Sequence, residues 1–294
     1  MTKRALLAYP FQPAFRSKLE ALCPVVGPFD GPITSALKPE KVAGIAVLIT
    51  LGSLKTDAAL MDQLPGLGLV CCYGSGYEGV DIAAAKQRGI AVAHSRGANA
   101  PAVAEQAMAL LLAACRRTLP ADQIVRTTGW RRGPGGGLPP ARGLAERKVG
   151  IFGLGAIGSR IAACVAPFGP EIGYHNRTPR SDVPYRYFTS LQALADWADT
   201  LVVAARADAS NRHAVSRQVM QALGPDGIVV NISRGSILDE AALIDLVQKG
   251  ALGAAGLDVF ENEPSVPDGL KQLPQVVLTP HVGGSTLGAQ AAMC

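Results

Sequence analysis

The segment that most constrains the fold is a short apolar run followed directly by three closely spaced glycines. Val149–Phe152 has the composition of a buried parallel strand, and Gly153, Gly155 and Gly158 follow it with G-x-G-x-x-G spacing. The residues from Ile157 to Pro167 then show helical periodicity. In such a strand–turn–helix, the first glycine makes a tight turn, the second exposes bare backbone to a pyrophosphate, and the third permits close helix–strand packing. The segment predicts a dinucleotide-binding turn, although glycine spacing by itself also fits an ordinary βα turn.

Strand-like and helix-like runs alternate along the chain, which predicts an α/β protein with two doubly wound parallel-sheet domains. We expect the first domain to comprise residues 1–97 plus 285–294, and the second residues 98–284; 294 residues suffice for two cores. The expected strands are Ala5–Ala8, Ile45–Ile49, Leu67–Cys71, Ile90–Ala93, Val149–Phe152, Glu171–His175, Tyr185–Phe188, Leu201–Ala204, Ile228–Ile232, Ala254–Val259 and Val276–Leu278. The expected helices are Pro13–Leu22, Asp57–Leu64 (capped by Thr56 or Asp57), Asp81–Arg88, Pro101–Arg117, Ile157–Pro167, Leu191–Ala198, Ser216–Leu223 and Asp239–Lys249.

The charge balance and the cysteines argue against several classes of protein. The chain has 28 Lys and Arg against 23 Asp and Glu, a net charge of +5, without a basic run, so we expect anionic small molecules rather than nucleic acid as partners. No apolar run has membrane-spanning length, and Ala5–Ala8 fits a first strand better than a signal peptide. The six cysteines lack metal-ligand spacing, which favours free thiols in a reducing cytoplasm and no metal site. Cys71 and Cys72 are adjacent in a strand and should face opposite ways.

The segment between the two expected sheets combines a strong helix with an irregular stretch. Pro101–Arg117 is apolar nearly all round, so we expect it to be buried between domains or subunits. Gly129–Pro140 is rich in Gly, Pro and Arg and predicts a loop, in which Trp130 would be either a packing anchor or an interface residue.

The residues after the second strand of the glycine-bearing domain bear on the choice between NAD and NADP. NAD sites use an Asp or Glu about 20 residues past the glycines to bind the ribose 2′-hydroxyl. Here the segment contains Asn176, Arg177 and Thr178 and no acid. A guanidinium and a hydroxyl suit a 2′-phosphate, which favours NADP(H) with NADH possible. The alternative is that Arg177 is a solvated loop charge.

Three chemically distinct side chains follow successive strands of the same sheet. Arg234, the acids Glu261 and Glu263, and His281 come after the strands at Ile228–Ile232, Ala254–Val259 and Val276–Leu278, so an arginine, a carboxylate and a histidine should lie at the edge that carries the glycine loop. The guanidinium could bind a substrate carboxylate bidentately and polarise the adjacent carbonyl, and the imidazole could deliver a proton to its oxygen. A carboxylate beside the imidazole would fix its tautomer and keep it protonated. Each residue also has an ordinary structural interpretation, but their shared edge favours reduction of a 2-oxo acid.

These segments together resemble the D-isomer-specific 2-hydroxyacid dehydrogenase family, and within it the glyoxylate/hydroxypyruvate reductase branch. The resemblance rests on Gly74–Tyr77 with Val80 and Asp81, Val103–Glu105, Gly153–Gly158, Asn231–Gly235, Leu257–Pro264 and Pro280–Gly283. It implies a flavodoxin-like substrate domain and a Rossmann NADP-binding domain. It also implies that Arg234 binds the substrate, that Glu263 is the partner of the histidine and that His281 is the acid/base, while Leu51, Gly52, Ser75 and Gly76 hold the substrate carboxylate. The implied cofactor-binding residues are Gly153, Leu154, Gly155, Ala156, Ile157, Gly158, Asn176, Arg177, Thr178, Ala205, Arg206, Asn211, Ile232, Ser233, Asp258, Gly283 and Gly284, with Asp258 on the nicotinamide carboxamide.

The resemblance further implies a homodimer, with the helix after the first domain and the following arm at the interface and Trp130 reaching toward the partner's active site. Two features depart from the family pattern. The chain ends at Cys294, so the helix that usually follows the histidine segment is expected to be cut short. The residues Ala205, Arg206 and Ala207 replace a Pro- or Gly-containing loop beside the adenosine, and Arg206 could add to phosphate binding.

The function expected from these residues is NADPH-dependent reduction of small 2-oxo acids, glyoxylate or hydroxypyruvate, to D-2-hydroxy acids. One alternative is a dehydrogenase for a bulkier acid such as hydroxyphenylpyruvate or 2-ketogluconate, decided by Leu51, Tyr73 and Tyr77. Another is a protein that senses NAD(P)H without turnover.

Overall fold

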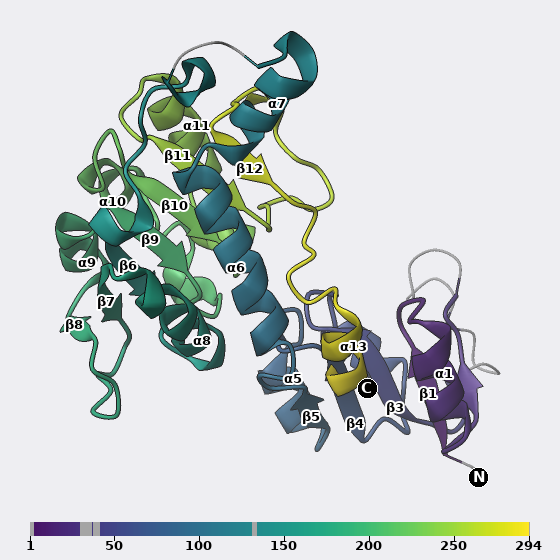
Figure 1. The fold of residues 1–294 in the computed structure, drawn as a ribbon. Coiled ribbons are helices and arrows are strands. Elements are labelled where there is room, and N and C mark those ends of the chain that lie inside the picture. Colours follow the sequence, from purple (N-terminus) through teal and green to yellow (C-terminus); the bar gives the residue numbers. More distant parts are fainter. Residues whose placement is uncertain (1–2, 30–36, 38–41, 131–133, 294) are drawn as a thin grey trace. The chain divides into compact units, whose positions relative to one another are not determined.

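The computed structural model describes residues 3–29, 37, 42–130 and 134–293, which form two compact units (Figure 1). Unit 1 consists of Met1–Asn99 with Leu287–Cys294, and unit 2 consists of Ala100–Thr286. Each unit is built on its own parallel sheet, one of five strands and one of seven, which confirms the predicted α/β class. The predicted loop residues 131–133 and the chain end at Cys294 lie outside the described residues.

Unit 1 contains a five-stranded parallel sheet in the order β2-β1-β3-β4-β5. This is the flavodoxin-like order 2-1-3-4-5. Its strands are β1 (Arg4–Leu7), β2 (Val25–Val26), β3 (Ile45–Leu51), β4 (Leu69–Tyr73) and β5 (Ala91–His94), and its helices are α1 (Pro13–Glu20), α4 (Ala58–Asp62), α5 (Ile82–Gln87) and α13 (Leu287–Met293). Cys72 packs into the cluster under α4 and α5, and Cys71 packs on the other face, as their adjacency in β4 predicts.

The last helix, α13, is held to unit 1 by hydrogen bonds to three separate elements (Figure 1). Gln12 Nε2 donates to Gln290 Oε1 at 2.7 Å, the Tyr73 hydroxyl donates to Gln290 O at 3.3 Å, and Ser95 Oγ donates to Met293 O at 3.3 Å. A segment that follows all of unit 2 in sequence therefore belongs to unit 1, and of its helix only Ala289 is buried.

Unit 2 contains a seven-stranded parallel sheet in the order β12-β11-β10-β9-β6-β7-β8. Counted within the unit, this is the Rossmann order 3-2-1-4-5-6 with one further strand. Its strands are β6 (Lys148–Phe152), β7 (Glu171–His175), β8 (Arg186–Phe188), β9 (Thr200–Val203), β10 (Ile228–Asn231), β11 (Ala254–Leu257) and β12 (Val276–Leu278). Its α-helices are α6 (Ala100–Cys115), α7 (Thr118–Thr128), α8 (Ala156–Val165), α9 (Leu191–Trp197), α10 (Arg217–Ala222), α11 (Glu240–Gln248) and α12 (Asp268–Lys271).

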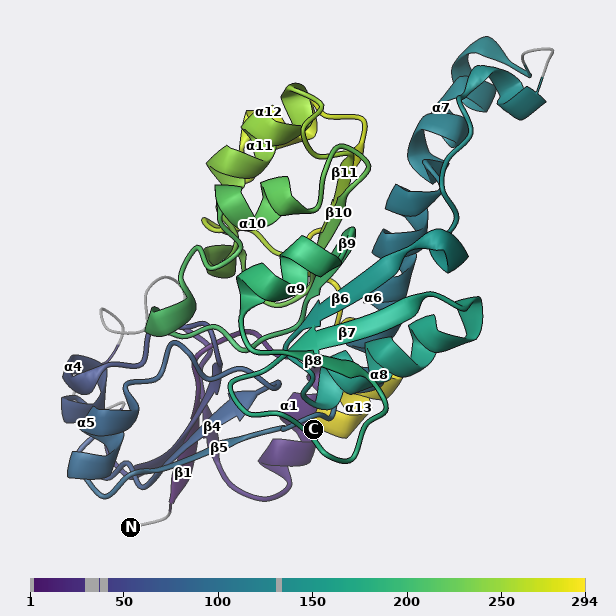
Figure 2. The same ribbon diagram turned by 90° about the vertical axis from the view of Figure 1, so that its left-hand side faces the viewer.

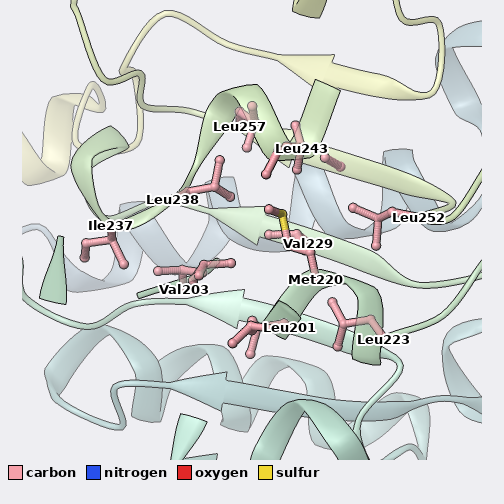
Figure 3. Close-up of a cluster of buried hydrophobic side chains, with 14 of the residues drawn as sticks. Leu201, Val203, Met220, Leu223, Val229, Ile237, Leu238, Leu243, Leu252 and Leu257 are labelled. Carbon is pink, nitrogen blue, oxygen red and sulfur yellow. The ribbon is translucent and has the colours of Figure 1, made fainter. Parts of the chain in front are cut away.

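The sheet of unit 2 is buried on both faces, which is why its strands are continuous apolar runs. Helices α9, α10 and α11 cover one face, and α6 and α8 cover the other (Figure 2). On the first face, side chains of β9, β10 and β11 pack against Met220 of α10, Leu223 directly after α10 and Leu243 of α11 (Figure 3). On the second face, a Cβ at Gly256 would lie 2.8 Å from Leu110 Cβ, so α6 lies directly on β11.

Capping carboxylates and hydroxyls determine where several helices begin. Asp57 accepts a hydrogen bond from Leu60 N at 3.0 Å and Asp81 accepts one from Ala84 N at 2.8 Å. Ser190 and Asp239 cap α9 and α11 in the same way. Asp57, one of the two residues predicted to cap this helix, is therefore confirmed as the cap.

The sequence analysis did not identify β2, α7 or α12, and it placed several boundaries differently. β2 is only two residues long and α12 only four, which is too short for a periodic pattern to be recognised. α7 begins directly after Arg117, the predicted end of the long helix, and Arg117 has φ = 51°, which breaks the helix between the observed end at Cys115 and Thr118. The long helix itself ends at Cys115, and it packs within unit 2 on β10, β11, β12 and α8. None of the helices in the described part of the chain could cross a membrane.

Candidate active site

The glycine loop between β6 and α8 is fixed by close backbone contacts. Gly153 has φ = +98°, and a Cβ there would lie 2.4 Å from the Ala205 backbone. A Cβ at Gly158 would lie 2.1 Å from the carbonyl oxygen of Gly153, whereas a Cβ at Gly155 would meet nothing within 4 Å. The first and third glycines are therefore required by packing, and the second leaves open space beside the backbone, as the dinucleotide pattern requires.

Two side chains from the loop after β7 hold the glycine loop in place. Asn176 Oδ1 accepts a hydrogen bond from Leu154 N at 2.6 Å. Arg180 Nη1 donates to Leu154 O at 3.0 Å and to Ser159 Oγ at 2.7 Å. Among the residues that the structure describes, no side chain caps the N-terminus of α8 at Gly155, so its first N–H groups are available to an anion. The residues present therefore fit a bound pyrophosphate.

The residues proposed to select the cofactor lie in loops on both sides of the glycine loop. Arg177 is 85% exposed, and its Nη1 lies 3.7 Å from Oδ2 of Asp208 in the loop after β9. Asp208 N donates to Asn211 Oδ1 at 2.9 Å, and Asn211 Nδ2 donates to Arg206 O at 2.8 Å. Asn211, a predicted cofactor ligand, thus uses its amide to stabilise the loop that carries Arg206.

Arg234 follows β10 in a turn organised by an asparagine and a glycine. Asn231 Nδ2 donates to Arg234 O at 3.0 Å, and Asn231 Oδ1 accepts from Ser233 N at 3.1 Å. A Cβ at Gly235 would lie 1.9 Å from the carbonyl carbon of Phe260, so only glycine permits this turn to pack on the loop after β11. The turn that carries Arg234 and the loop that carries Glu263 are therefore in direct backbone contact.

Asp258 at the end of β11 organises the loop that carries His281. It is 1% exposed, and its Oδ1 accepts from Thr279 Oγ1 at 2.6 Å and from Val282 N at 2.9 Å. Its Oδ2 accepts from Gly283 N at 2.8 Å, and its backbone oxygen accepts from His281 N at 2.7 Å. The carboxylate proposed to bind the nicotinamide carboxamide therefore has three hydrogen bonds within the protein, of about four that a carboxylate can accept.

Glu263 and His281 form a direct carboxylate–imidazole pair. His281 Nδ1 lies 2.8 Å from Glu263 Oε2, and Glu263 Oε1 accepts from Phe260 N at 3.0 Å. Burial raises the pKa of the Glu263 carboxyl, but the hydrogen bonds from His281 and Phe260 and the charges of His281 and Arg234 outweigh burial and lower this pKa overall. The other ring nitrogen, Nε2, has no hydrogen-bond partner among the residues that the structure describes. His281 has φ = 52°, a sparsely populated conformation for a residue other than glycine, which the hydrogen bond from its N–H to Asp258 O holds in place.

The sequence analysis missed a buried acid, Glu240, behind this pair. Glu240 is 5% exposed at the start of α11, and its Oε1 accepts from Glu261 N at 2.7 Å. Burial raises its pKa, and the charges of Glu261 and Glu263 act in the same direction. Glu261 in turn pairs with Arg212 and with His213 Nε2. The sequence does not indicate that Glu240 is buried, because an acid in the first turn of a helix is usually exposed. Its hydrogen bond with Glu261 N becomes visible only in the structure.

In unit 1, the predicted substrate-binding residues lie together at the carboxyl ends of β3 and β4. A Cβ at Gly52 would lie 2.0 Å from Gly76 O, so the two loops are in van der Waals contact. The Ser75 hydroxyl lies 2.6 Å from Asn99 Oδ1 and 3.2 Å from Ser95 O, and Leu51 O accepts from Leu54 N. Gly52 is buried and Gly76 is partly buried at this edge, so the backbone of Ser75 and Gly76 is more accessible to a ligand than that of Gly52.

A Rossmann unit whose cofactor edge carries an arginine and a carboxylate–imidazole pair defines a class, the NAD(P)-dependent oxidoreductases. Comparison with known proteins assigns the family within it. Residues 108–283 match the model of the D-isomer specific 2-hydroxyacid dehydrogenase NAD binding domain. Glyoxylate/hydroxypyruvate reductase A of Arabidopsis thaliana is 36% identical over 288 residues, 98% of this chain and 91% of its own length. 2-Ketogluconate reductase of Gluconobacter oxydans is 35% identical over 263 residues, 89% of this chain and 84% of its own.

Solved structures agree with the sequence comparisons. The NADPH-dependent glyoxylate/hydroxypyruvate reductase of Sinorhizobium meliloti, solved with NADP and malonate, superposes with a TM-score of 0.92 at 36% identity, covering 100% of this chain and 90% of its own. The chain belongs to the D-isomer specific 2-hydroxyacid dehydrogenase family. It is an NAD(P)-dependent 2-oxo acid reductase of the glyoxylate/hydroxypyruvate reductase kind.

Replacing Glu240 tests whether the acid behind the pair positions it. Glu240→Ala removes the acceptor for Glu261 N and leaves a buried N–H unpaired, which should cost about 1–3 kcal/mol of folding free energy. It should also lower kcat more than it changes KM, because the loop that carries Glu263 loses the hydrogen bond from Glu261 N that fixes its position. Glu240→Gln keeps an acceptor oxygen and should retain most of the activity. The measurement is kcat and KM, determined separately as a function of pH, and a kcat and pH profile identical in the Ala variant and the wild type would contradict the positioning role.

The lowered pKa of Glu263 predicts a pH-dependent contribution to stability. Because the folded-state pKa lies below the ordinary value of 4.5, the carboxylate stabilises the fold above that value, and this contribution is lost as the pH falls through the folded-state pKa. The difference in Tm between the wild type and Glu263→Gln should therefore be largest near neutral pH and shrink as the pH falls below 4.5. Thermal unfolding across this range measures it, and a difference independent of pH would show that Glu263 contributes only through packing.

Proposed function

We propose that this chain is an NADPH-dependent reductase of small 2-oxo acids, with glyoxylate and hydroxypyruvate as the leading substrates and D-2-hydroxy acids as products. The observation that carries the proposal is the 2.8 Å contact between His281 Nδ1 and Glu263 Oε2, within electrostatic range of Arg234. A carboxylate, an imidazole and a guanidinium are the groups needed to hold a 2-oxo acid and protonate its carbonyl oxygen.

Each of these three side chains has a separate task in the proposed reaction. Arg234 binds the substrate carboxylate with two parallel hydrogen bonds and orients the adjacent carbonyl. His281 donates the proton from Nε2 to the carbonyl oxygen, and Glu263 accepts from Nδ1, which fixes the ring orientation and stabilises the imidazolium. Ser75 and Gly76 are proposed to bind the substrate carboxylate through their backbone N–H groups.

The cofactor would be held by the loops at the carboxyl edge of the unit 2 sheet. The glycine loop and the start of α8 would hold the pyrophosphate, and the fourth acceptor position of Asp258 would hold the nicotinamide carboxamide. When bound, the reduced nicotinamide supplies the hydride. The remaining predicted contacts lie in loops that follow strands of this sheet, at Ala205, Arg206, Asn211, Ile232, Ser233, Gly283 and Gly284.

NADPH is proposed as the preferred cofactor because the segment after β7 provides Arg177 and Thr178 and no carboxylate. The Sinorhizobium meliloti structural relative is NADPH-dependent and was solved with NADP, which supports this choice. A guanidinium gains more from a phosphate than from a hydroxyl, because the hydrogen bond to a phosphate is charge-assisted on both sides.

A homodimer is proposed from the exposed surface of α7. This helix has no buried residue, Leu119 is 48% exposed and Val125 55%, and the neighbouring Trp130 is 82% exposed. These exposed apolar side chains make α7 and Trp130 the surface that is proposed to pack against a second copy of the chain.

The first experiment measures oxidation of NADPH and of NADH by glyoxylate, hydroxypyruvate, pyruvate, hydroxyphenylpyruvate and 2-ketogluconate, followed by reduced-nicotinamide absorbance. We expect the highest kcat/KM for NADPH with glyoxylate or hydroxypyruvate. Higher kcat/KM for the larger acids would favour the bulkier-substrate alternative, which the similarity to 2-ketogluconate reductase makes worth testing. Binding of NADPH without oxidation by any acid would favour a nucleotide-sensing protein.

His281→Ala should abolish most turnover while leaving cofactor binding intact. Loss of a positioned general acid typically costs about 10²–10⁴-fold in kcat. The dissociation constant of NADPH should remain close to the wild-type value, because the imidazole contacts the substrate and not the nucleotide. His213→Ala is the matched control, since His213 also pairs with a glutamate, Glu261, rather than with Glu263, and it should keep more of the activity. An equal loss of binding and turnover in His281→Ala would indicate a structural role.

A further inference from the structure

The segment after β7 lacks the carboxylate that NAD-binding sites use, yet a carboxylate lies next to Arg177 in the folded chain. It belongs to Asp208, whose Oδ2 is 3.7 Å from Arg177 Nη1. We propose that Asp208 supplies a second mode of cofactor binding, in which its carboxylate accepts a hydrogen bond from the ribose 2′-hydroxyl of NADH. This inference rests on the function proposed above. Arg177 serves the 2′-phosphate of NADPH, so the two residues together set the balance between the cofactors.

The topology of unit 2 places Asp208 on the correct side of the cofactor loop. In the sheet, β6 lies between β9 and β7, so the loops after β9 and β7 flank the glycine loop that follows β6. Gly153 is in contact with the backbone of Ala205, at the start of the loop that carries Asp208. The adenosine half of a dinucleotide lies beside the glycine loop of a Rossmann unit. Residues from both flanking loops therefore reach the region of the ribose.

Asp208 is held in a defined position by one half of its carboxylate. Its Oδ1 accepts from Ser210 N at 2.9 Å and from the Ser210 hydroxyl, and its backbone N–H donates to Asn211 Oδ1 at 2.9 Å. The hydrogen bonds from the Ser210 hydroxyl and N–H, together with the charges of Arg177 and Arg206, lower the pKa of Asp208, so the group is ionised at neutral pH. The oxygen Oδ2 is therefore presented by a fixed side chain toward Arg177.

The contact between Arg177 and Asp208 is weak enough to be exchanged for a ligand. At 3.7 Å it is an ion pair without a hydrogen bond, and the arginine side chain is 85% exposed. A 2′-phosphate can therefore bind Arg177 in place of Asp208, although the carboxylate of Asp208 repels the phosphate. A 2′-hydroxyl carries no charge, so it is not repelled and can donate to Oδ2 in a charge-assisted hydrogen bond.

Asp208→Asn tests this proposal without removing the local cap. The amide oxygen can still accept from Ser210, while the negative charge that faces Arg177 is lost. We expect the ratio of the NADH to the NADPH dissociation constant to rise about tenfold, because a charge-assisted hydrogen bond to NADH is weakened and repulsion of the phosphate is removed. Arg177→Gln should change the ratio in the opposite direction by weakening NADPH. Asp268→Asn, at an 87% exposed acid on α12, is the control for net charge and should leave the ratio unchanged.

Dissociation constants are measured by nucleotide fluorescence on the full chain, and kcat/KM with glyoxylate is measured in parallel. A ratio unchanged in Asp208→Asn would overturn the proposal, as would a larger loss for NADPH than for NADH, which would mean that Asp208 orients Arg177 toward the phosphate. A wild-type chain that does not bind NADH would also overturn it. Failure of the proposed function appears differently, as nucleotide binding without oxidation by any 2-oxo acid, and the binding ratio still tests Asp208 in that case.

Discussion

The buried carboxylate of Asp258 is the interaction on which the arrangement of the catalytic loop depends. A carboxylate with 1% exposure is stable only when its oxygens are hydrogen-bonded, and the loop 279–283 supplies three donors to it. The same residue accepts His281 N through its backbone oxygen, and its own N–H donates to Asn231 O of the neighbouring strand. The position of the imidazole is therefore tied to the register of β10 and β11 rather than to the conformation of an exposed loop.

Close backbone contacts also fix the positions of the loops that lie beside the His281 loop. Gly235 lies against the backbone of Phe260, and the segment that follows Phe260 is held by Glu240 and carries Glu263. Gly153 lies against Ala205 in a similar way, which joins the glycine loop to the loop after β9. In both places a Cβ would collide with backbone, which cannot move aside as a flexible side chain could. Glycine at these positions couples loops that come from different strands, so the site behaves as one preorganised edge.

Much of this architecture follows from local sequence, because the carboxyl ends of parallel strands share one edge. The strand before Gly153 and the strands before Arg234 and His281 were recognisable as apolar runs, which predicts that these residues come to the same side of a sheet. The buried state of Glu240 was not predictable, since a helix-initial glutamate has the same local sequence whether it is exposed or covered by a distant loop. The two-residue strand β2 has no periodicity to detect, and it forms because β1 offers a free edge for pairing. Local pattern therefore predicts elements and edges, while tertiary contacts decide which polar groups are buried.

The charges near the ribose site show the same division between local and tertiary information. Read along the sequence, the segment after β7 presents a guanidinium, an amide and a hydroxyl, which describes a phosphate site. In the fold, Asn176 uses its amide oxygen on Leu154 N, and Arg177 faces a carboxylate 31 positions later in the chain. The electrostatic potential at the ribose is therefore set by the charges of Arg177, Asp208 and Arg206, which lie on two loops, and not by the sequence of one loop alone. Because exposed pairs of this kind are worth about 1 kcal/mol or less, small changes in either loop can shift cofactor preference without altering the fold.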